Sequence, residues 1–351
     1  MTLTIPSEIQ QAMSQGAALA ISISGGKDSQ AMLNVLAAEY KRQNWSGPIY
    51  AIHAHLGRAE WPQTLGHCEK ITRDLGIELV VVSRPQGDLV QEIHDRMEKV
   101  AGTYKPHWPS ATNRYCTSDQ KRGQIDKVIR VPHWPSSTSR YCTSHHKSNQ
   151  IDKAIRSHWP SSTQRYCTAD QKRDQIVKQH RQHRLVVAAM GLRAEESPAR
   201  AKKQAASVCS RTTSTVLKGL LPGEALAKQQ SNQHLTIDWL AIHDWKVDDV
   251  WDACGTDRDA LEIRRGLYRE GLKLRSLDGW PAHPAYVFGN ERLSCAICIL
   301  ASKNDIINGA KHNPELYREY VAMERESGFT FRHGFALESL GSELELAEVL
   351  S

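Results

Sequence analysis

A short glycine-containing segment between a strand pattern and a helix pattern constrains the fold of this chain most strongly. Residues 18–23 (ALAISI) form a short apolar run with β-branched residues, which is typical of a buried strand. Residues 27–42 carry apolar side chains at helical spacing. The segment SGGKDS spans the junction. A strand, turn and helix in this order are typical of α/β folds.

The same alternation continues along the first half of the chain. Further strands are predicted over residues 49–56, 78–83 and 185–190, and further helices over residues 64–75 and 88–100. Alternating strands and helices predict a doubly wound, Rossmann-like parallel sheet with helices on both faces.

The chain is expected to have two parts. Its 351 residues are enough for one large domain or two modest ones. We expect an α/β domain over residues 1–235 and a smaller, mainly helical region over residues 236–351. In the second region, residues 247–251 open a predicted helix, and further helices are predicted over residues 259–274 and 314–326.

The SGGKDS segment has the composition and position of a phosphate-binding loop. Glycines let the backbone approach an anion closely, and the first N–H groups of a helix have no partners within the helix. The lysine adds a positive charge, the second serine adds a hydroxyl, and the aspartate can hold Mg²⁺ or orient the loop. The alternative is an ordinary glycine-containing turn. The residues expected to bind phosphate are Ser24, Gly25, Gly26, Lys27, Asp28 and Ser29.

Three nearly identical segments follow the helix predicted over residues 88–100. They begin at His107, His133 and His158, and each contains His-Trp-Pro, Arg-Tyr-Cys-Thr, a Lys four residues after the Thr, and Gln-Ile. Because the Trp-Pro step disfavours helix and the later residues have helical spacing, each copy is predicted to be a loop followed by a short helix. The close similarity indicates a local duplication of one functional element, over about residues 107–180, and not a solenoid.

The duplicated region also carries the basic charge of the chain. Residues 101–184 contain 16 Lys or Arg, five Asp and no Glu, a formal charge of +11, whereas the whole chain has a charge of +6. A basic segment with interleaved aromatic residues suits contact with nucleic-acid phosphates and stacking on bases. The alternative is a solvated helical surface. The aromatic residues are Trp108, Trp134, Trp159, Tyr115, Tyr141 and Tyr166.

Five segments together resemble one family. SGGKDS resembles the signature of the PP-loop ATP pyrophosphatases, and four further segments resemble the phosphoadenosine phosphosulfate reductase-like branch of that superfamily. They lie in the family's order over about residues 18–330. These four are Arg165-Tyr166-Cys167-Thr168 followed by Lys172, GLRAEES followed by Arg200, the segment from Trp245 to Trp251, and HPAY followed by RLSCAIC.

The resemblance implies an adenine nucleotide bound at the carboxyl edge of a parallel sheet. Carried over by motif, Lys27 and Asp28 would take part in catalysis. Guanidinium groups match phosphate and sulfate oxygens, whereas the alternative for Glu195, Glu196 and Arg200 is a surface helix start with i,i+4 pairing. The further residues expected to line the nucleotide site are Arg193, Glu196, Ser197 and Arg200.

Members of the family either cleave ATP to adenylate an acceptor oxygen, usually so that sulfur replaces it, or reduce adenylylated sulfate. The sulfate-ester reductases usually have an altered loop and carry a cysteine in a Glu-Cys-Gly-Leu-His tail. Here the loop is complete and the sequence ends in LELAEVLS. The complete loop favours ATP and Mg²⁺ as cofactors, with adenylation of an acceptor, release of pyrophosphate and sulfur transfer.

The partners expected for this chemistry are an adenine nucleotide, a tRNA or DNA acceptor and a sulfur-donor protein. Two other functions are alternatives. One is a reductase acting on phosphoadenosine or adenosine phosphosulfate. The other is a nucleic-acid-binding module with a regulatory nucleotide site.

The eight cysteines are expected to be reduced thiols or metal ligands. Cys295 and Cys298 form a C-x-x-C pair, which suits one metal, a cluster or a redox couple. Because family members with iron–sulfur clusters combine cysteines from separated segments, our hypothesis is a [4Fe–4S] cluster held by this pair and Cys167, with Cys116 as the alternative to Cys167. Zinc and a pair of buried thiols are the alternatives. The candidates for a fourth ligand are Cys209, Cys254 and a second repeat cysteine.

Two smaller features complete the expectations. His53 and His55 share one face of a predicted strand end, either as a metal pair or as satisfied polar groups. No apolar run approaches the about 20 residues of a membrane span, and residues 1–10 lack the pattern of a signal peptide. No membrane partner and a cytoplasmic location are therefore expected.

Overall fold

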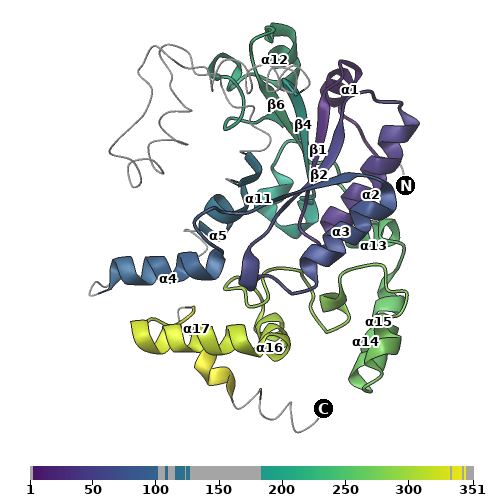
Figure 1. Ribbon diagram of the computed structural model, residues 1–351. Helices are drawn as coiled ribbons and strands as arrows, with labels where there is room; N and C mark the ends of the chain where they lie inside the picture. Colours follow the sequence, from purple (N-terminus) through teal and green to yellow (C-terminus); the bar gives the residue numbers. More distant parts are fainter. Residues whose placement is uncertain are drawn as a thin grey trace, which may run out of the picture.

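A six-stranded sheet forms the centre of the structure, a computed structural model that describes residues 3–101, 107–109, 115–122, 124–126, 183–332, 334–341 and 344 (Figure 1). The strand order is β3-β2-β1-β4-β6-β5. All neighbours pair in parallel except β5 and β6, which are antiparallel. The expected α/β class with a mostly parallel sheet is therefore confirmed. The strands are β1 (Ala18–Ile23), β2 (Ile49–Ala54), β3 (Glu78–Val82), β4 (Leu185–Met190), β5 (Ala206–Val208) and β6 (Leu235–Trp239).

The strand order changes direction next to β1. The chain passes from β1 outward to β2 and β3 on one side, and later returns to place β4 on the other side of β1. Leu19 of β1 accordingly pairs with Ile49 of β2 and with Val187 of β4. Ligands of open α/β sheets bind outside the carboxyl ends of the strands at such a switch point. The SGGKDS segment directly follows the last residue of β1, so it lies at this switch point.

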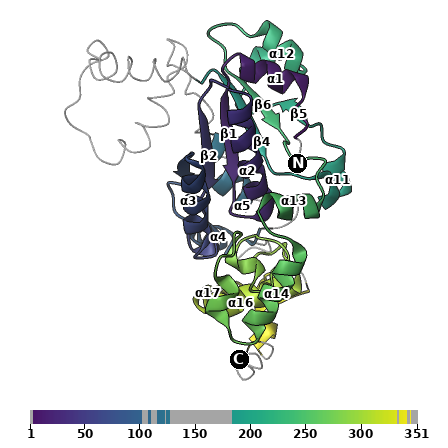
Figure 2. The same cartoon turned by 90° about the vertical axis from the view of Figure 1, so that its right-hand side faces the viewer.

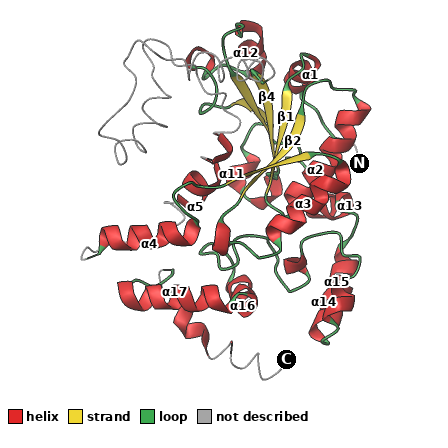
Figure 3. Ribbon diagram, in the orientation of Figure 1, coloured by secondary structure: helices red, strands yellow, loops and turns green. Residues whose placement is uncertain are grey.

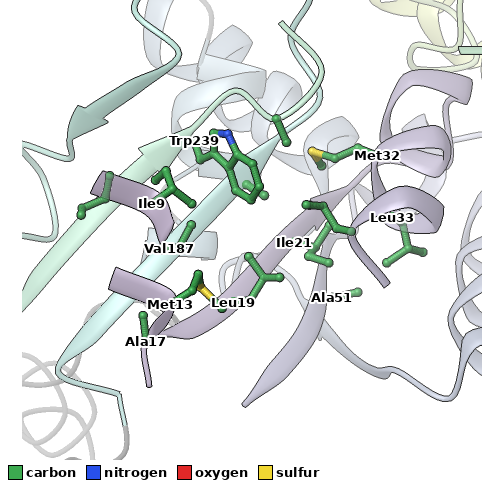
Figure 4. Close-up of a cluster of buried hydrophobic side chains, with 14 of the residues drawn as sticks. Ile9, Met13, Ala17, Leu19, Ile21, Met32, Leu33, Ala51, Val187 and Trp239 are labelled. Carbon is green, nitrogen blue, oxygen red and sulfur yellow. The ribbon is translucent and has the colours of Figure 1, made fainter. Parts of the chain in front are cut away.

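One face of the sheet carries the main core (Figure 4). Leu19, Ile21 and Ile23 of β1 point to this face, because side chains alternate along a strand. They pack with Met32 and Trp239, both fully buried. The helices that contribute to this core are α1 (Ser7–Ser14), α2 (Lys27–Arg42), α3 (Thr64–Leu75), α12 (Pro222–Lys228) and α13 (Val247–Ala253).

The opposite face of the sheet buries a smaller cluster of mostly small side chains. It includes Ala18, Ala20 and Ala188, with Ile125 packed against it. Ile125 belongs to the first repeat copy, whose short helices α5 (Tyr115–Thr117) and η2 (Ser118–Arg122) lie on this side, η2 contacting β2. Within the described residues, the first repeat copy covers this face of the sheet with that short helical segment. The longer helices α1, α2 and α3 pack on the face that carries the main core.

The helices that follow residue 257 gather at the carboxyl end of the sheet, together with α4 (Figures 1 and 2). A second core joins α4 to them through Leu89, Ile93, Trp61 and Tyr320. Asp88 caps α4 by accepting a hydrogen bond from the Gln91 N–H. The helices are α4 (Leu89–Val100), α14 (Arg258–Arg269), α15 (Lys273–Leu277), η5 (Pro284–Tyr286), α16 (Lys303–His312), α17 (Pro314–Ser327) and η6 (Leu337–Leu340).

Two expectations for this half need correction. The helix predicted over residues 259–274 is two helices, since α14 ends at Arg269 and α15 begins at Lys273. Gly271 lies between them with a φ of +81°, a conformation that favours glycine and breaks a helix. The division expected at residue 235 falls on the first residue of β6, so the sheet continues into the region expected to be mainly helical.

Short helical turns occupy many of the loops at the carboxyl end of the sheet (Figure 3). They are η1 (Gly57–Ala59), η3 (Ala194–Glu196) and α11 (Pro198–Ala201). A further turn, η4 (Thr215–Leu217), lies near the start of β6, where the Ser214 N–H donates to the His234 carbonyl. Within the part of the chain that the structure describes, every helix is too short or too polar to cross a bilayer.

Candidate functional site

The SGGKDS loop is folded by its own side chains. The Ser29 hydroxyl donates to the Gly26 carbonyl at 2.8 Å and accepts from the Ser24 N–H at 3.1 Å. Gly25 has a φ of +76°, and a Cβ there would lie 3.1 Å from Thr64 Cγ2. Glycine is therefore required at this position for both conformation and space. The loop ends where α2 begins, at Lys27.

The C-terminal half holds the loop in place. Tyr286 accepts a hydrogen bond from the Lys27 N–H at 3.0 Å, and its ring lies 5.5 Å from the Lys27 ammonium. Trp251 lies 5.8 Å from the same ammonium. The Cys254 thiol donates to the Lys27 carbonyl at 3.4 Å. Burial raises the pKa of Tyr286, so its hydroxyl stays protonated. These contacts bury the side chain of Lys27.

Asp28 is paired with two cations. One carboxylate oxygen lies 3.3 Å from the Lys27 ammonium, and the other accepts from Arg193 Nε. Burial works to lower the pKa of Arg193, but the ion pairs with Asp28 and Glu195 outweigh burial and raise that pKa. The structure shows Asp28 paired within the protein. Both roles expected for Asp28, loop orientation and Mg²⁺ binding, stay predictions.

A cavity of about 820 Å³ opens in front of the loop, over the second face of the sheet. Its floor is formed by small strand residues, among them Ala20, Ala54 and Ala188, which leave room for a planar group. This volume lies within the range of ligand and cofactor pockets. Of the residues expected to bind the nucleotide, the cavity is lined by Ser24, Gly26, Lys27, Asp28, Ser29, Arg193, Glu196 and Arg200.

Gly25 and Ser197 are the two expected site residues that do not line the cavity. Gly25 shapes the loop, and Ser197 is the N-cap of α11, where its hydroxyl accepts from the Arg200 N–H at 3.3 Å. Arg200 also forms an ion pair with Glu196. The sequence left two readings open for Glu196 and Arg200, a nucleotide site or a surface pair at i,i+4. The structure contains the i,i+4 pair, and both residues also line the cavity.

The first repeat copy forms the wall opposite the loop. Thr117, Lys121 and Arg122 line the cavity, together with Ile125 and Asp126. Gln120 is buried and donates to Glu92 of α4 at 2.7 Å, which fixes the short helix against α4. The corresponding residues of the second and third copies lie outside the described residues.

Trp108 of the first copy has a structural role, which corrects the expectation that it stacks on bases. It is 4% exposed, and its ring centroid lies 5.4 Å from that of Tyr320 and 5.1 Å from that of Phe331. Its indole N–H donates to the Phe329 carbonyl at 3.2 Å. A side chain inside the second core presents no face for a base. Trp134 and Trp159 lie outside the described residues, as do Tyr141 and Tyr166.

The C-x-x-C pair lies at the rim of the cavity. Cys298 lines the cavity, and its hydrogen bond with Cys295 holds its pKa down at about 6 despite burial. The same hydrogen bond, together with burial and the nearby Cys116, raises the pKa of Cys295. The ammonium of Lys121 favours the thiolate form of both members of the pair.

Three cysteines therefore gather here, and the third comes from the first repeat copy. Cys116 packs against the same core as Cys295, whereas Cys167 lies outside the described residues. The two other candidates for a ligand are engaged elsewhere, Cys254 with the Lys27 carbonyl and Cys209 with the Asp238 side chain. Among the described residues, the ligand atoms that converge closely enough for one metal ion are those of His53, His55 and Glu60, so metal binding by the three thiols stays a prediction.

His53 and His55 share one acidic partner that sequence reasoning did not identify. Glu60 Oε2 lies 3.2 Å from His53 Nε2 and 3.0 Å from His55 Nδ1. Burial works to raise the pKa of Glu60, but the hydrogen bonds from both histidines, with help from the charge of Lys121, hold it at about 2. The expectation that both histidines lie on one face of the strand end is confirmed.

Other residues of the site were also missed. They are charged or polar groups that line the cavity from distant segments: Lys121, Arg122, Arg211, Asp238, Tyr286 and Arg292. Each repeat has a lysine at the position of Lys121, and this repetition could have identified Lys121 as a candidate site residue. Arg211 lies in a polar stretch without a pattern, and it pairs with Asp126 at 2.7 Å.

No protein-family model matches the chain, and no curated protein matches it. The fold and the site define an α/β protein with a large cavity, lined by both apolar and charged side chains, at the carboxyl ends of its parallel strands. The chemistry of that cavity is the basis of the proposal that follows.

Proposed function

We propose that this chain is a PP-loop enzyme of the phosphoadenosine phosphosulfate reductase-like family that binds ATP with Mg²⁺ and adenylates an acceptor, with release of pyrophosphate, for sulfur transfer. One observation carries the proposal. The SGGKDS loop, at the start of a helix and at the switch point of the sheet, lines a cavity of about 820 Å³. The helix start and Lys27 favour an anion there.

In the proposed reaction, an acceptor oxygen attacks the α-phosphorus of ATP. The bond from that phosphorus to the oxygen bridging to the β-phosphate breaks, and pyrophosphate leaves with the electron pair. The acceptor loses its proton to solvent. Lys27 and the first N–H groups of α2 would hold the phosphates, and Mg²⁺ would neutralise charge on the leaving group. The protein's contribution is mainly positioning and charge neutralisation.

Cations that line the cavity support an anionic second substrate; acidic side chains, among them Asp126, Asp238 and Asp305, line it as well. Lys121, Arg122 and Arg292 line the cavity beside the residues expected to hold the nucleotide. A tRNA or DNA acceptor would bring further phosphates, which cations of this kind contact. Because Trp108 is buried, this proposal relies on charge rather than on stacking by that residue.

The cysteines near the cavity would serve the sulfur chemistry of the proposed reaction. Cys116, Cys295 and Cys298 would hold a [4Fe–4S] cluster or a zinc ion, with one further ligand. A bound cluster would offer a site for sulfide or for an electron near the activated acceptor. The sulfur itself would come from a donor protein. In this arrangement the charge of Lys121 favours the thiolate form of Cys298, whose pKa is about 6, and works against the raised pKa of Cys295.

The test is pyrophosphate release from ATP and Mg²⁺ by anaerobically purified protein, with pooled tRNA or DNA added. Asp28→Asn removes the charge that orients Arg193 and Lys27, and it should abolish release. Asp74→Asn is the matched control, since Asp74 is 58% exposed and pairs only with Lys70 in the described structure. Release that rises with one nucleic acid identifies the acceptor class. Equal release by wild type and Asp28→Asn would contradict the proposal.

A reductase is the second candidate, because Cys298 lines the cavity with a lowered pKa. Its thiolate would attack the sulfur of an adenylylated sulfate and break the bond from that sulfur to the nucleotide phosphate oxygen, so that the adenosine phosphate leaves and Cys298 carries an S-sulfonate. The thiolate of Cys295 would then attack Cys298 Sγ, which releases sulfite and closes a disulfide. Sulfite formed from phosphoadenosine phosphosulfate, together with no pyrophosphate from ATP, would favour this candidate.

A further inference from the structure

We propose that His53, His55 and Glu60 form a binding site for one divalent transition-metal ion of the zinc class, separate from the phosphate loop and from the C-x-x-C pair. Three ligand atoms converge there: His53 Nε2, His55 Nδ1 and Glu60 Oε2, all within 4.8 Å of one another. Two neutral imidazoles and one carboxylate are a common donor set for zinc and for iron(II).

The spacing of the ligand atoms fits an ion. A tetrahedral ion with bonds of about 2.1 Å places its ligands about 3.4 Å apart. The two nitrogen–oxygen separations in this cluster are 3.2 and 3.0 Å. A shift of a few tenths of an ångström would therefore open the cluster around an ion, without a change of backbone.

The hydrogen bonding of His53 points in the same direction. Its Nδ1 lies 3.3 Å from the Ile23 carbonyl oxygen, which only accepts hydrogen bonds, so we assign the ring hydrogen to Nδ1. When the ring is neutral, Nε2 then carries a lone pair that faces the Glu60 carboxylate, so either a second ring proton or a metal ion must lie between these two atoms. The proton is the state in which both histidines donate to Glu60, and a metal ion would replace it. The other tautomer would place two acceptors together at Ile23, with Nδ1 facing the Cys68 thiol at 3.7 Å. Metal-bound histidines characteristically donate their second nitrogen to a carbonyl in this way.

The burial of the ligands also suits a metal site with one accessible side. The side chains of His53 and Glu60 are 1% and 5% exposed, and that of His55 is 33% exposed. An ion would be held from the protein side and open to solvent at His55. Lys121 is a cation close enough to lower the pKa of Glu60, so it competes with a metal. Strong binding therefore requires displacement of the lysine ammonium toward the cavity that it also lines.

A metal in this position would tie together three parts of the site. His53 and His55 come from the end of β2, and Glu60 follows η1. The Ala59 carbonyl, next to Glu60, accepts from the Ala296 N–H of the C-x-x-C loop at 2.9 Å. His53 contacts the last residue of β1, directly before the phosphate loop. An ion would therefore stabilise the junction between the phosphate loop and the cysteine pair.

The test is Co²⁺ binding to chelator-treated full-length protein without nucleotide, followed by visible absorption. A site of two imidazoles and a carboxylate gives ligand-field bands without the near-ultraviolet thiolate charge-transfer band. We expect one such ion per chain, and the same stoichiometry when Cys295→Ser and Cys298→Ser are introduced together. His55→Gln should weaken binding by about 100-fold or more.

His94→Gln is the matched control, because His94 is 32% exposed and lies 3.1 Å from the carboxylate of Glu319. It should bind Co²⁺ as the wild type does. Zn²⁺ should raise the melting temperature of the wild type and of His94→Gln, but not of His55→Gln. The proposal is overturned by Co²⁺ bands that vanish in the double cysteine variant and persist in His55→Gln. It is equally overturned by the absence of stoichiometric binding to the wild type, which would mean that protons alone hold the cluster.

Discussion

Replacing Trp108 by alanine tests whether the first repeat copy, and not one of the others, completes the second core. The Trp108 side chain is 4% exposed and packs on Tyr320 and Phe331. A buried aromatic side chain removes about 200 Å² from water, which corresponds to about 5 kcal/mol at ~25 cal/mol per Å². Partial collapse of the site reduces this value, so we expect Trp108→Ala to lower the free energy of unfolding by about 3–5 kcal/mol.

The repeats supply their own matched controls. Trp134→Ala and Trp159→Ala make the same chemical change in nearly the same local sequence. If Trp108 alone fills the core, each should lower the free energy of unfolding by less than about 0.5 kcal/mol. The assay is urea denaturation followed by far-ultraviolet circular dichroism. A small effect of Trp108→Ala, with a large effect only when all three tryptophans are replaced, would refute the reasoning, because the copies would then exchange in one site.

Three further outcomes are expected. First, deletion of residues 128–178, which removes the second and third copies and joins Lys127 to Gln179, should leave stability and nucleotide binding intact. The two ends to be joined lie on the same part of the sheet: Ile125 packs on the same cluster as Tyr50, and the Tyr50 ring lies 6.0 Å from that of His183. The five residues that remain between Asp126 and His183 can span about 20 Å. Loss of soluble protein would contradict this. Second, Gly25→Ala should weaken ATP binding by at least about tenfold, because the φ of Gly25 is +76° and an added Cβ would crowd Thr64. Gly223→Ala is the control, since a Cβ there meets no atom within 4 Å. Equal ATP affinities of the two variants would refute this prediction. Third, burial lowers the pKa of His283 to about 3, so the unfolded chain gains a proton below pH 6.5 that the folded chain does not. Stability should fall from about pH 6.5 toward pH 4, by up to about 1.4 kcal/mol per unit for this group. His283→Gln should flatten that dependence in urea titrations at several pH values, and an unchanged slope would exclude the explanation.

The regular elements of the sheet domain were predictable because their patterns are local. The ranges of β1, α2, α3 and β4 agree with the structure at both ends. Gly76 ends α3 with a φ of +68°, as its position after the last helical residue indicates. By contrast, α1, β6 and the elements in the polar stretch of residues 202–231 were not predicted. A strand of three residues, such as β5 (Ala206–Val208), is too short to show a period.

The candidate site was predictable only where it is continuous in sequence. SGGKDS lies at one junction, so its position follows from the strand and helix around it. The contact of Tyr286 with the Lys27 N–H joins residues 259 positions apart, and no local pattern reports such a contact. The shared Glu60 was missed for a similar reason, since it becomes the partner of His53 and His55 only when η1 folds back.

The choice between repeat copies could not be made from their letters. Cys116 and Cys167 sit in nearly the same local sequence, so composition and spacing alone do not distinguish Cys167, our first choice as a ligand, from Cys116. The structure adds the contacts of the first copy, including the bond from Gln120 to Glu92 of α4. These contacts are tertiary, and they bring Cys116 near Cys295.

Direct measurement of ATP binding tests the central claim, that the loop between β1 and α2 is a nucleotide site. We would titrate Mg²⁺·ATP calorimetrically into the wild type, Lys27→Met and Lys41→Met. Lys27→Met keeps the buried aliphatic stem and removes the charge beside the phosphates. Lys41 is exposed near the other end of α2 and serves as the control. Loss of one charge-assisted contact costs about 1.5–3 kcal/mol, so Lys27→Met should bind about 10- to 100-fold more weakly, and Lys41→Met should bind as the wild type does. No binding by the wild type, or equal affinity in all three proteins, would contradict the account.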